Sequence, residues 1–381
     1  MKILQVILFF SPKFGGSVTV PYQLSKELSK RGHDVTIITT DFGFDSEYAK
    51  TIEGSGVRVI PFRTIVNFGP FIYTPSIKPW LRENIRKFDV IHMHDFRSYQ
   101  NIVIHSIAIK YGIPYIVQAH GSVPLNHKKI QKKGFDLLWG HRLLKNAAQA
   151  IALTRTEKDQ YIAIGVDGKN ISIIPNGIDP ATYDQPQLKG LFKQIYDIPS
   201  NFKIILYLGR LHKSKGIDLL IESFIETRKK IKNIKLVIIG PDDGFKETLN
   251  DLINRFQIKK DVILLDFISN KEKISAFFDA DVFVTPKFSG FPITFLEACV
   301  CGTPIVTTEN GDTLEWINNK VGFVVEYDKN QLHDKIHEIL INESLKKKFG
   351  DEGKKLIIDR FNLAKIASDN ERIYEKCLRK K

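Results

Sequence analysis

The segment IILYLGRLHKSKG, residues 204–216, predicts a strand, a turn and a helix start in direct succession. The apolar run Ile204–Leu208 is typical of a buried strand, and the glycines at positions 209 and 216 mark the turn. Arg210 and Lys215 lie between these glycines, where the strand gives way to the helix. Cations at a helix start suit an anionic ligand such as a diphosphate. The structural alternative is that both are ordinary solvated charges.

The segment SGFPITFLEA, residues 289–298, places a turn with glycine and proline before a second helix start. Bare amides at such a start also suit an anion. Glu297 is the one acid here, among apolar neighbours. Burial of an unpaired carboxylate is costly, and the two hydroxyls of a ribose would supply partners; an acid on the helix surface is the alternative. Together the two segments predict an enzyme that holds a nucleotide-linked donor.

Short apolar runs alternate with longer helical periods along the chain, which is typical of parallel α/β sheets. Each half fits a doubly wound sheet of its own, so we predict an α/β fold with two such domains. The predicted strands are 3–9, 34–40, 57–60, 89–93, 114–118, 149–153, 171–174, 203–208, 235–239, 262–266, 282–285, 304–307 and 322–325. The predicted helices are 18–31, 98–111, 131–147, 215–231, 243–256, 271–279 and 293–301.

The stretch 179–201 is the predicted linker between the domains, because it contains three prolines and shows no strong period. The predicted parts are a first domain, 1–183, a second domain, 184–362, and a terminal helical stretch, 363–381. Open α/β sheets bind ligands beyond the carboxyl ends of their strands. We therefore expect the two domains to face a cleft lined by strand-end loops.

Composition narrows the classes of function. At 381 residues with 43% hydrophobic residues, the chain can build two cores and shows no sign of disorder. No apolar run reaches the roughly 18 residues that a transmembrane helix needs, and the apolar N-terminus lacks a small-residue cleavage site. Three cysteines cannot form a disulfide framework, which indicates reduced thiols in a cytoplasmic protein.

The net charge of +13 is concentrated in the first half, where Lys78–Lys145 holds twelve Lys and Arg against four acids. Such a charge is typical of proteins that bind nucleic acid or an anionic membrane. The sequence has no zinc finger, homeodomain or RNP-type aromatic motif. We therefore predict no nucleic-acid partner.

Two strand-end loops of the first half carry further candidates. Gly15 and Gly16 precede a helix and let a backbone approach a ligand closely, although a Gly-Gly turn is often purely structural. His120 lies beside Gly121 at the end of a predicted strand. A neutral imidazole there can bond a sugar hydroxyl or a phosphate oxygen, so we favour a ligand role over a structural one.

Another segment of the first half, with two histidines, is harder to interpret. His92 and His94 share one face of a predicted strand, which ends at Asp95. No third ligand at a suitable spacing supports a metal, so no metal site is predicted. We expect His92 to pack in the core and leave His94 and Asp95 open between packing and a place at the cleft edge.

Taken together, these motifs resemble the retaining GT-B glycosyltransferases of family 4, often called group 1. The resemblance covers nearly the whole chain and depends on the order and spacing of the motifs. They are Phe14-Gly15-Gly16, His120-Gly121, Pro175-Asn176-Gly177-Ile178-Asp179, Gly209–Gly216, Ser289–Ala298 and Gly302-Thr303-Pro304. The terminal helix is also similar to the family's segment that crosses back onto the first domain.

The resemblance implies a transfer from a nucleotide sugar, with UDP expected before GDP, to a glycan or a lipid-linked acceptor, with no cofactor and no metal. Arg210 and Lys215 would bind the donor diphosphate, and Glu297 the ribose. The implied donor-binding residues are Gly15, Gly16, Arg210, Lys215, Gly290, Phe291, Pro292, Ile293, Thr294 and Glu297, and those at the reaction centre are His120 and Ser289.

Ser289 departs from the family pattern, which usually has a glutamate eight positions before the ribose-binding one. A hydroxyl can bond a donor-sugar hydroxyl, but it carries no charge to stabilise an oxocarbenium-like centre. The identity of the donor sugar is therefore open. Two alternatives also stay open: a nucleotide-sugar-binding protein with reduced or lost catalysis, and a GT-B sugar-nucleotide epimerase, which the motif order disfavours.

The stretch HKKIQKK, residues 127–133, is basic and leads into an apolar run that ends at Trp139. One interpretation is that residues 127–145 contact an anionic membrane that presents a lipid-linked acceptor. The other is a solvated helix face. We expect a cytoplasmic protein, free or peripheral on the inner face of the membrane.

Overall fold

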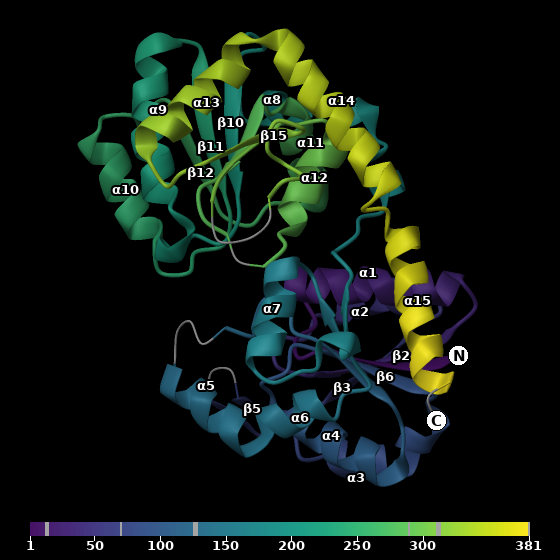
Figure 1. The fold of residues 1–381 in the computed structure, drawn as a ribbon. Coiled ribbons are helices and arrows are strands. Elements are labelled where there is room, and N and C mark those ends of the chain that lie inside the picture. The colour runs from purple at the N-terminus through teal and green to yellow at the C-terminus, as the bar shows by residue number, and fades with distance from the viewer. Residues whose placement is uncertain (12–14, 69–70, 125–128, 289, 310–313, 380–381) are drawn as a thin grey trace. The chain divides into compact units, whose positions relative to one another are not determined.

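The structure, a computed structural model, describes residues 1–11, 15–68, 71–124, 129–288, 290–309 and 314–379. The chain forms two compact units, which are Met1–Gly177 together with Leu363–Lys381, and Ile178–Asn362. Each unit has its own parallel sheet with helices packed around it (Figure 1). The predicted α/β class with two doubly wound units is confirmed.

The second unit begins earlier than the predicted boundary after residue 183. Ile178 forms a β-bridge with Asn362, and its amide donates to the Phe361 carbonyl at 2.9 Å. The Tyr183 hydroxyl donates to Glu297, which also lies in the second unit. Residues 178–183 belong to the second unit because their partners are there.

The first unit is built on a seven-stranded sheet in the order β3-β2-β1-β6-β7-β8-β9. This order reverses between β1 and β6, which is where open α/β sheets bind ligands. A separate antiparallel hairpin, β4–β5, was not among the predicted strands. The strands are β1 (Lys2–Val6), β2 (Asp34–Thr40), β3 (Arg58–Phe62), β4 (Val66–Phe68), β5 (Phe71–Tyr73), β6 (Val90–His94), β7 (Tyr115–Gln118), β8 (Gln149–Ala152) and β9 (Ile171–Ile173).

The predicted helix 131–147 is divided in the structure. A π-helical turn, Asp136–Gly140, separates α5 from α6. A Cβ at Gly140 would lie 2.7 Å from Asp136 Oδ1, so this crowded turn needs glycine. The helices of the first unit before the terminal one are α1 (Gly16–Lys30), α2 (Ser46–Glu53), α3 (Ile77–Asn84), α4 (Tyr99–Tyr111), α5 (Lys129–Phe135), α6 (His141–Lys145) and α7 (Arg155–Ala163).

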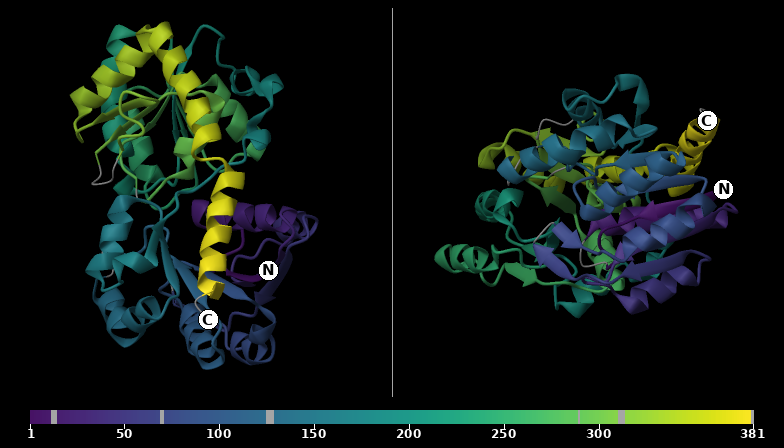
Figure 2. Two further views of the ribbon diagram at one scale, coloured as in Figure 1. Left: turned by 45° about the vertical axis from the view of Figure 1, so that its right-hand side comes forward. Right: turned by 90° about the horizontal axis from the view of Figure 1, so that it is seen from below.

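The terminal helix α15 (Leu363–Arg379) belongs to the first unit and packs against α1 (Figures 1 and 2). Glu371 accepts two hydrogen bonds from the Arg31 guanidinium, at 2.8 and 2.7 Å, and lies 2.7 Å from His33 Nε2. The bonds from Arg31 hold the pKa of Glu371 below its usual value. This ion pair and the burial of Tyr374 fasten α15 to the unit that contains the N-terminus.

The second unit has a six-stranded sheet in the order β12-β11-β10-β13-β14-β15, which reverses between β10 and β13. Every strand predicted for this half is present. The strands are β10 (Lys203–Leu208), β11 (Ile234–Ile239), β12 (Val262–Leu265), β13 (Val282–Thr285), β14 (Ile305–Thr308) and β15 (Gly322–Val325). The helices are α8 (Leu191–Ile195), α9 (Ile217–Lys230), α10 (Lys246–Arg255), α11 (Asn270–Asp279), α12 (Ile293–Cys301), α13 (Lys329–Ile341) and α14 (Glu343–Asp359).

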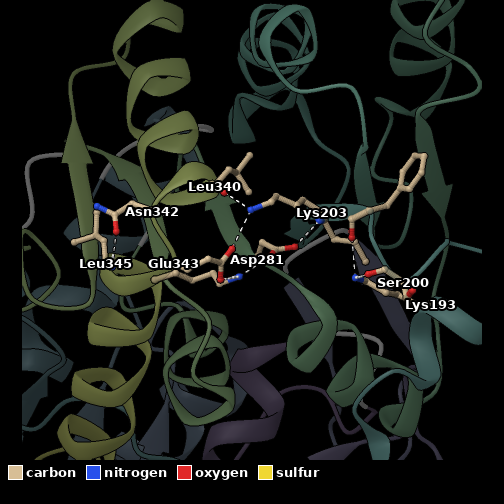
Figure 3. A network of polar contacts seen from close by, with 11 residues as sticks. Lys193, Ser200, Lys203, Asp281, Leu340, Asn342, Glu343 and Leu345 are labelled. Carbon is tan, nitrogen blue, oxygen red and sulfur yellow. Dashed lines mark hydrogen bonds and ion pairs between the residues drawn. The ribbon is translucent and has the colours of Figure 1, made fainter.

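A polar network joins α14 to the start of β10 (Figure 3). The Lys203 ammonium lies 3.0 Å from Glu343, and Asp281 accepts from the Ile204 amide at 2.9 Å. Lys346 contacts both carboxylates, at 2.8 Å to Asp281 and 2.6 Å to Glu343. The network fixes the edge of the sheet opposite to the strand ends that carry the candidate ligand loops.

Cys299, Cys301 and Cys377 are buried and form no disulfide with one another, and burial raises the pKa of Cys299 and of Cys301 above the usual value. Such thiols are inert because the reactive thiolate is disfavoured. Within the described ranges, the helices are too short or too polar to cross a membrane.

Candidate functional site

Two loops of the second unit follow neighbouring strands at the point where the strand order reverses. Residues 209–216 follow β10, and residues 286–288 and 290–292 follow β13. Their backbones meet, because the Lys287 amide donates to the Lys215 carbonyl at 3.1 Å. Gly216 has a φ of +68°, and a Cβ there would lie 2.9 Å from the hydroxyl of Tyr327. The structure therefore brings the first of the two segments that the sequence singles out next to the loop that leads into the second.

Lys215 is half-buried in the turn directly before α9. Burial lowers the pKa of its ammonium, and the positive charge of Arg210 lowers it further. In the part of the chain that the structure describes, no carboxylate forms an ion pair with Lys215. A partly desolvated cation without a fixed counter-ion is suited to an anionic ligand.

Arg210 is exposed, and its guanidinium pairs with Asp243 at 2.6 Å. The exposed fractions of the two side chains are 61% and 40%. An ion pair this exposed contributes little stability, so a phosphate can replace Asp243 at small cost. Asp243 was not predicted, because nothing in the sequence indicates which acid faces Arg210.

Glu297 is buried in α12, and its carboxylate has partners within the protein. Its Oε1 accepts from the Tyr183 hydroxyl at 2.8 Å and from the Lys273 ammonium at 2.6 Å. These protein groups already compensate the buried charge, so burial alone does not require a ribose. Both bonds use Oε1, and none of the described residues bonds Oε2. The predicted ribose contact therefore stays a prediction, now with a defined oxygen.

The residues before and within the first turn of α12 leave helix amides without a capping side chain. Pro292 is the N-cap, and no side chain accepts a hydrogen bond there. Gly290 has a φ of +64°, and the Phe291 ring stacks on Trp316 with centroids 5.6 Å apart. Ile293 and Thr294 begin the helix. An amide-rich helix start of this kind favours an anion; Ser289 lies outside the described residues.

In the first unit, two residues at adjacent strand ends adopt left-handed backbone conformations. His120, just beyond β7, has a φ of +51°, and Asp95, just beyond β6, has a φ of +61°. The Asp95 amide donates to the Gln118 carbonyl at 2.8 Å, which holds the two ends together. Burial raises the pKa of Asp95 to about 7. Strained backbones of this kind cluster at functional sites.

His120 does not stand alone. Its Nε2 lies 2.8 Å from His94 Nδ1. His94, which the sequence left open between packing and a place at the cleft edge, therefore contacts the predicted reaction-centre residue His120. His92 is fully buried, as expected, and bonds the Tyr374 hydroxyl at 2.8 Å. Burial lowers the pKa of His120 to about 4 and that of His92 to about 3, so both rings are neutral at pH 7.

Gly15 and Gly16 lie at the same edge of the sheet as His120, because β1 pairs with β6 and β6 with β7. Gly15 has a φ of +75° and is the N-cap of α1. A Cβ at Gly15 would meet no atom within 4 Å. Its positive φ, rather than crowding, therefore accounts for the glycine.

The turn after His120 is held by residues that were not among the predicted site residues. Glu157 accepts from the Gly121 amide at 2.6 Å and from the Leu153 amide at 2.7 Å. Arg97 donates to two carbonyls just beyond His120 and pairs with Asp136 at 2.7 Å. The TRTE pattern at 154–157 is a capping-box signal for α7 and could have revealed Glu157; no local signal marks Arg97.

Two models of known families match the chain, one in each half. The model for Glycosyltransferase Family 4 matches residues 14–182, and the model for Glycosyl transferases group 1 matches residues 189–356. The chain belongs to the family-4 GT-B glycosyltransferases.

Two relatives of this glycosyltransferase match along nearly their whole length. An uncharacterized glycosyltransferase of Methanocaldococcus jannaschii is 25% identical, over 98% of each chain. The N-acetyl-alpha-D-glucosaminyl L-malate synthase of Bacillus anthracis is 24% identical, over 97% of this chain and 96% of its own. Among solved structures, Anabaena HepE in complex with UDP and glucose has a TM-score of 0.83 at 17% identity, over 99% of this chain and 100% of its own. That structural match supports the fold.

Proposed function

We propose that this glycosyltransferase moves a sugar from a nucleotide donor to a glycan or lipid-linked saccharide with retention of configuration. The observation that carries the proposal is the hydrogen bond from the Lys287 amide to the Lys215 carbonyl. It places a half-buried cation beside the loop that leads into the uncapped start of α12. A diphosphate suits both groups. UDP is favoured over GDP because the Anabaena neighbour was crystallised with UDP and glucose.

The proposed transfer needs no protein nucleophile. The acceptor oxygen attacks the anomeric carbon on the face from which the diphosphate leaves. The bond from this carbon to the phosphate oxygen breaks, a bond to the acceptor oxygen forms, and the acceptor proton passes to the leaving phosphate. Lys215, Arg210 and the first amides of α12 stabilise the charge that develops on the diphosphate, without a metal. His120 bonds a sugar hydroxyl at the reaction centre.

The donor is tested first by binding and then by turnover. Thermal shift with UDP, GDP and ADP should give the largest stabilisation with UDP, because a ligand that binds the folded state raises the melting temperature. Hydrolysis of UDP-sugars, followed by nucleotide release, should then identify the sugar. Absence of any nucleotide effect contradicts the proposal. UDP-sugar binding with neither hydrolysis nor transfer favours the binding-protein alternative.

Glu297→Gln should reduce the affinity for UDP by about 10- to 100-fold, because hydrogen bonds to a charged group contribute about 1.5–3 kcal/mol. The amide keeps the shape of the carboxylate but weakens the bond to a ribose hydroxyl. Isothermal titration with UDP measures the change. Glu338→Gln, on α13, is the control and should bind like wild type. The same loss of affinity for UDP and for pyrophosphate would contradict the ribose contact.

The segment around α5 and the π-helical turn supports the membrane part of the proposal. It exposes apolar side chains next to Lys132 and Lys133, and the exposed fractions are 87% for Ile130, 79% for Leu137 and 60% for Leu138. Apolar groups that are this exposed and lie together mark interaction surfaces. With cations beside them they suit an anionic bilayer, where a lipid-linked acceptor would be found.

Leu137→Ser combined with Leu138→Ser should weaken binding to phosphatidylglycerol vesicles by about 30- to 1,000-fold, since each leucine loses about 1–2 kcal/mol of apolar burial. Affinity for UDP should not change. Ile341→Ser with Ile358→Ser is the matched control, because both isoleucines are 62% exposed but lie in the second unit. Vesicle co-sedimentation measures binding. Equal sedimentation of the leucine variant and wild type would contradict the membrane contact.

A further inference from the structure

A buried chain of hydrogen bonds leads from His120 to the terminal helix. His120 Nε2 lies 2.8 Å from His94 Nδ1, and His94 Nε2 lies 2.7 Å from the side-chain oxygen of Gln5. The side-chain nitrogen of Gln5 donates to the Tyr374 hydroxyl at 3.4 Å. Gln5 is 0% exposed and His94 is 2% exposed. Water therefore cannot replace these partners without opening the core.

The side-chain amide of Gln5 determines which group donates in each of these hydrogen bonds. Its Oε1 can only accept, so His94 must donate from Nε2. Burial lowers the pKa of His94 well below its usual value, so the ring is neutral and its Nδ1 carries a lone pair. His120 must then donate from Nε2 to this lone pair. Because His120 is also neutral, its own Nδ1 is left as an acceptor.

We propose that Gln5 and His94 are positioning residues that hold His120 as the Nε2-protonated tautomer, so that its Nδ1 accepts a hydrogen bond from a substrate hydroxyl. This inference rests on the proposed function, in which His120 bonds a sugar hydroxyl at the reaction centre. In the other tautomer, His120 would present an N–H there, and the substrate hydroxyl would have to accept this hydrogen bond instead of donating it. The partner of one ring nitrogen thus decides the chemistry of the other.

The surrounding geometry supports positioning over simple packing. The His94 and His120 rings are nearly parallel, at 20°, with centroids 5.1 Å apart. The left-handed backbone of His120 aims its ring back toward β6 and its partner there. Tyr374 is supplied by α15, so the last helix of the chain completes the arrangement around a residue of the first strand.

The tautomer can be measured directly, without an activity assay. In full-length protein labelled with ¹⁵N-histidine, long-range proton–nitrogen correlation spectra distinguish protonation at Nε2 from protonation at Nδ1. Substitution of each histidine in turn assigns the signals. We expect both His94 and His120 to be protonated at Nε2 at pH 7.5. Protonation of His120 at Nδ1 would overturn the proposal, whatever the enzyme transfers.

Kinetics then test whether the arrangement matters for the reaction. Gln5→Met should lower kcat by about tenfold, a typical effect of losing an outer-shell partner, with unchanged affinity for UDP. Gln149→Met is the matched control, since Gln149 is also buried in this sheet and bonds Ser172 at 3.2 Å. It should keep the wild-type kcat. A Gln5→Met variant that folds and keeps full kcat would overturn the proposal.

Gln5→Glu adds a readout that a purely structural role would not produce. At alkaline pH its carboxylate accepts from His94 Nε2 and should restore kcat to near wild type. The negative charge of the introduced glutamate raises the pKa of His94. A protonated His94 donates from both nitrogens, so His120 must accept at Nε2 and carry its proton on Nδ1.

We therefore expect kcat to fall as the pH falls, in this variant alone. The other titratable groups around His94 are His92, His120, Asp95 and Tyr374. Equal loss in Gln5→Glu and Gln5→Met at every pH would overturn the proposal.

Discussion

Lys215→Met should lower kcat/KM for sugar transfer by about 100- to 1,000-fold, the range seen when one preorganised donor to a developing anion is removed. Methionine fills a similar volume and takes away only the charge and its hydrogen bonds. The loss should be large because Lys215 is half-buried, where Coulomb interactions are screened less than in water. Initial rates with the UDP-sugar found by donor hydrolysis measure the effect.

Lys213 offers the matched control for Lys215. It lies two residues earlier in the same 3₁₀ turn but is exposed. Lys213→Met should stay within about twofold of wild type, because an exposed charge is strongly screened. The pKa of Lys215, which burial and Arg210 lower in the free protein, should rise when a diphosphate binds. Retention of full kcat/KM in Lys215→Met would remove this lysine from the donor site.

Arg97→Met should lower the free energy of unfolding by about 3–5 kcal/mol, because it leaves the buried carboxylate of Asp136 without its partner. The exposed fractions of the two side chains are only 11% and 6%. The same substitution removes the donors to the Ser122 and Val123 carbonyls. Chemical denaturation, read by circular dichroism, measures the change, and the first unit should unfold first.

Two further variants define the origin of this loss. Arg97→Met combined with Asp136→Leu should recover most of the stability, since an apolar pair can replace a buried ion pair with little cost. Lys50→Met breaks an exposed pair with Glu47 and should change stability by less than about 0.5 kcal/mol. If Arg97→Met and Lys50→Met behave alike, the turn beyond His120 does not depend on Arg97.

The two parallel sheets were predictable because their strands are short apolar runs that differ clearly from the sequence around them. The helix α14 was not among the predicted helices, and its glycines at positions 350 and 353 look unfavourable for a helix. The structure explains both residues. A Cβ at Gly350 would lie 2.5 Å from the Gly302 carbonyl oxygen, and one at Gly353 would lie 3.2 Å from Cys299 Cα. Close packing against α12 therefore overrides the local preference.

The candidate site was predictable to the extent that its residues are marked by local patterns. Arg210 and Lys215 stand between glycines at a strand end, and Glu297 stands alone in an apolar helix. Their partners carry no such mark. Lys273 and Tyr183 reach Glu297 from 24 and 114 residues away in the sequence. One sequence contains many lysines and tyrosines at such separations, and only the folded chain selects these two.

The sequence by itself determined the α/β class, the two doubly wound sheets and the loops that follow the carboxyl ends of their strands. These follow from the alternation of apolar runs and from glycine placement, which are local properties. The tertiary structure alone decided that Glu297 already has protein partners, that Arg97 ties the His120 turn to Asp136, and that Gln5 orients His94. These contacts join side chains distant in sequence, and burial, which makes each bond strong and its loss costly, exists only after folding.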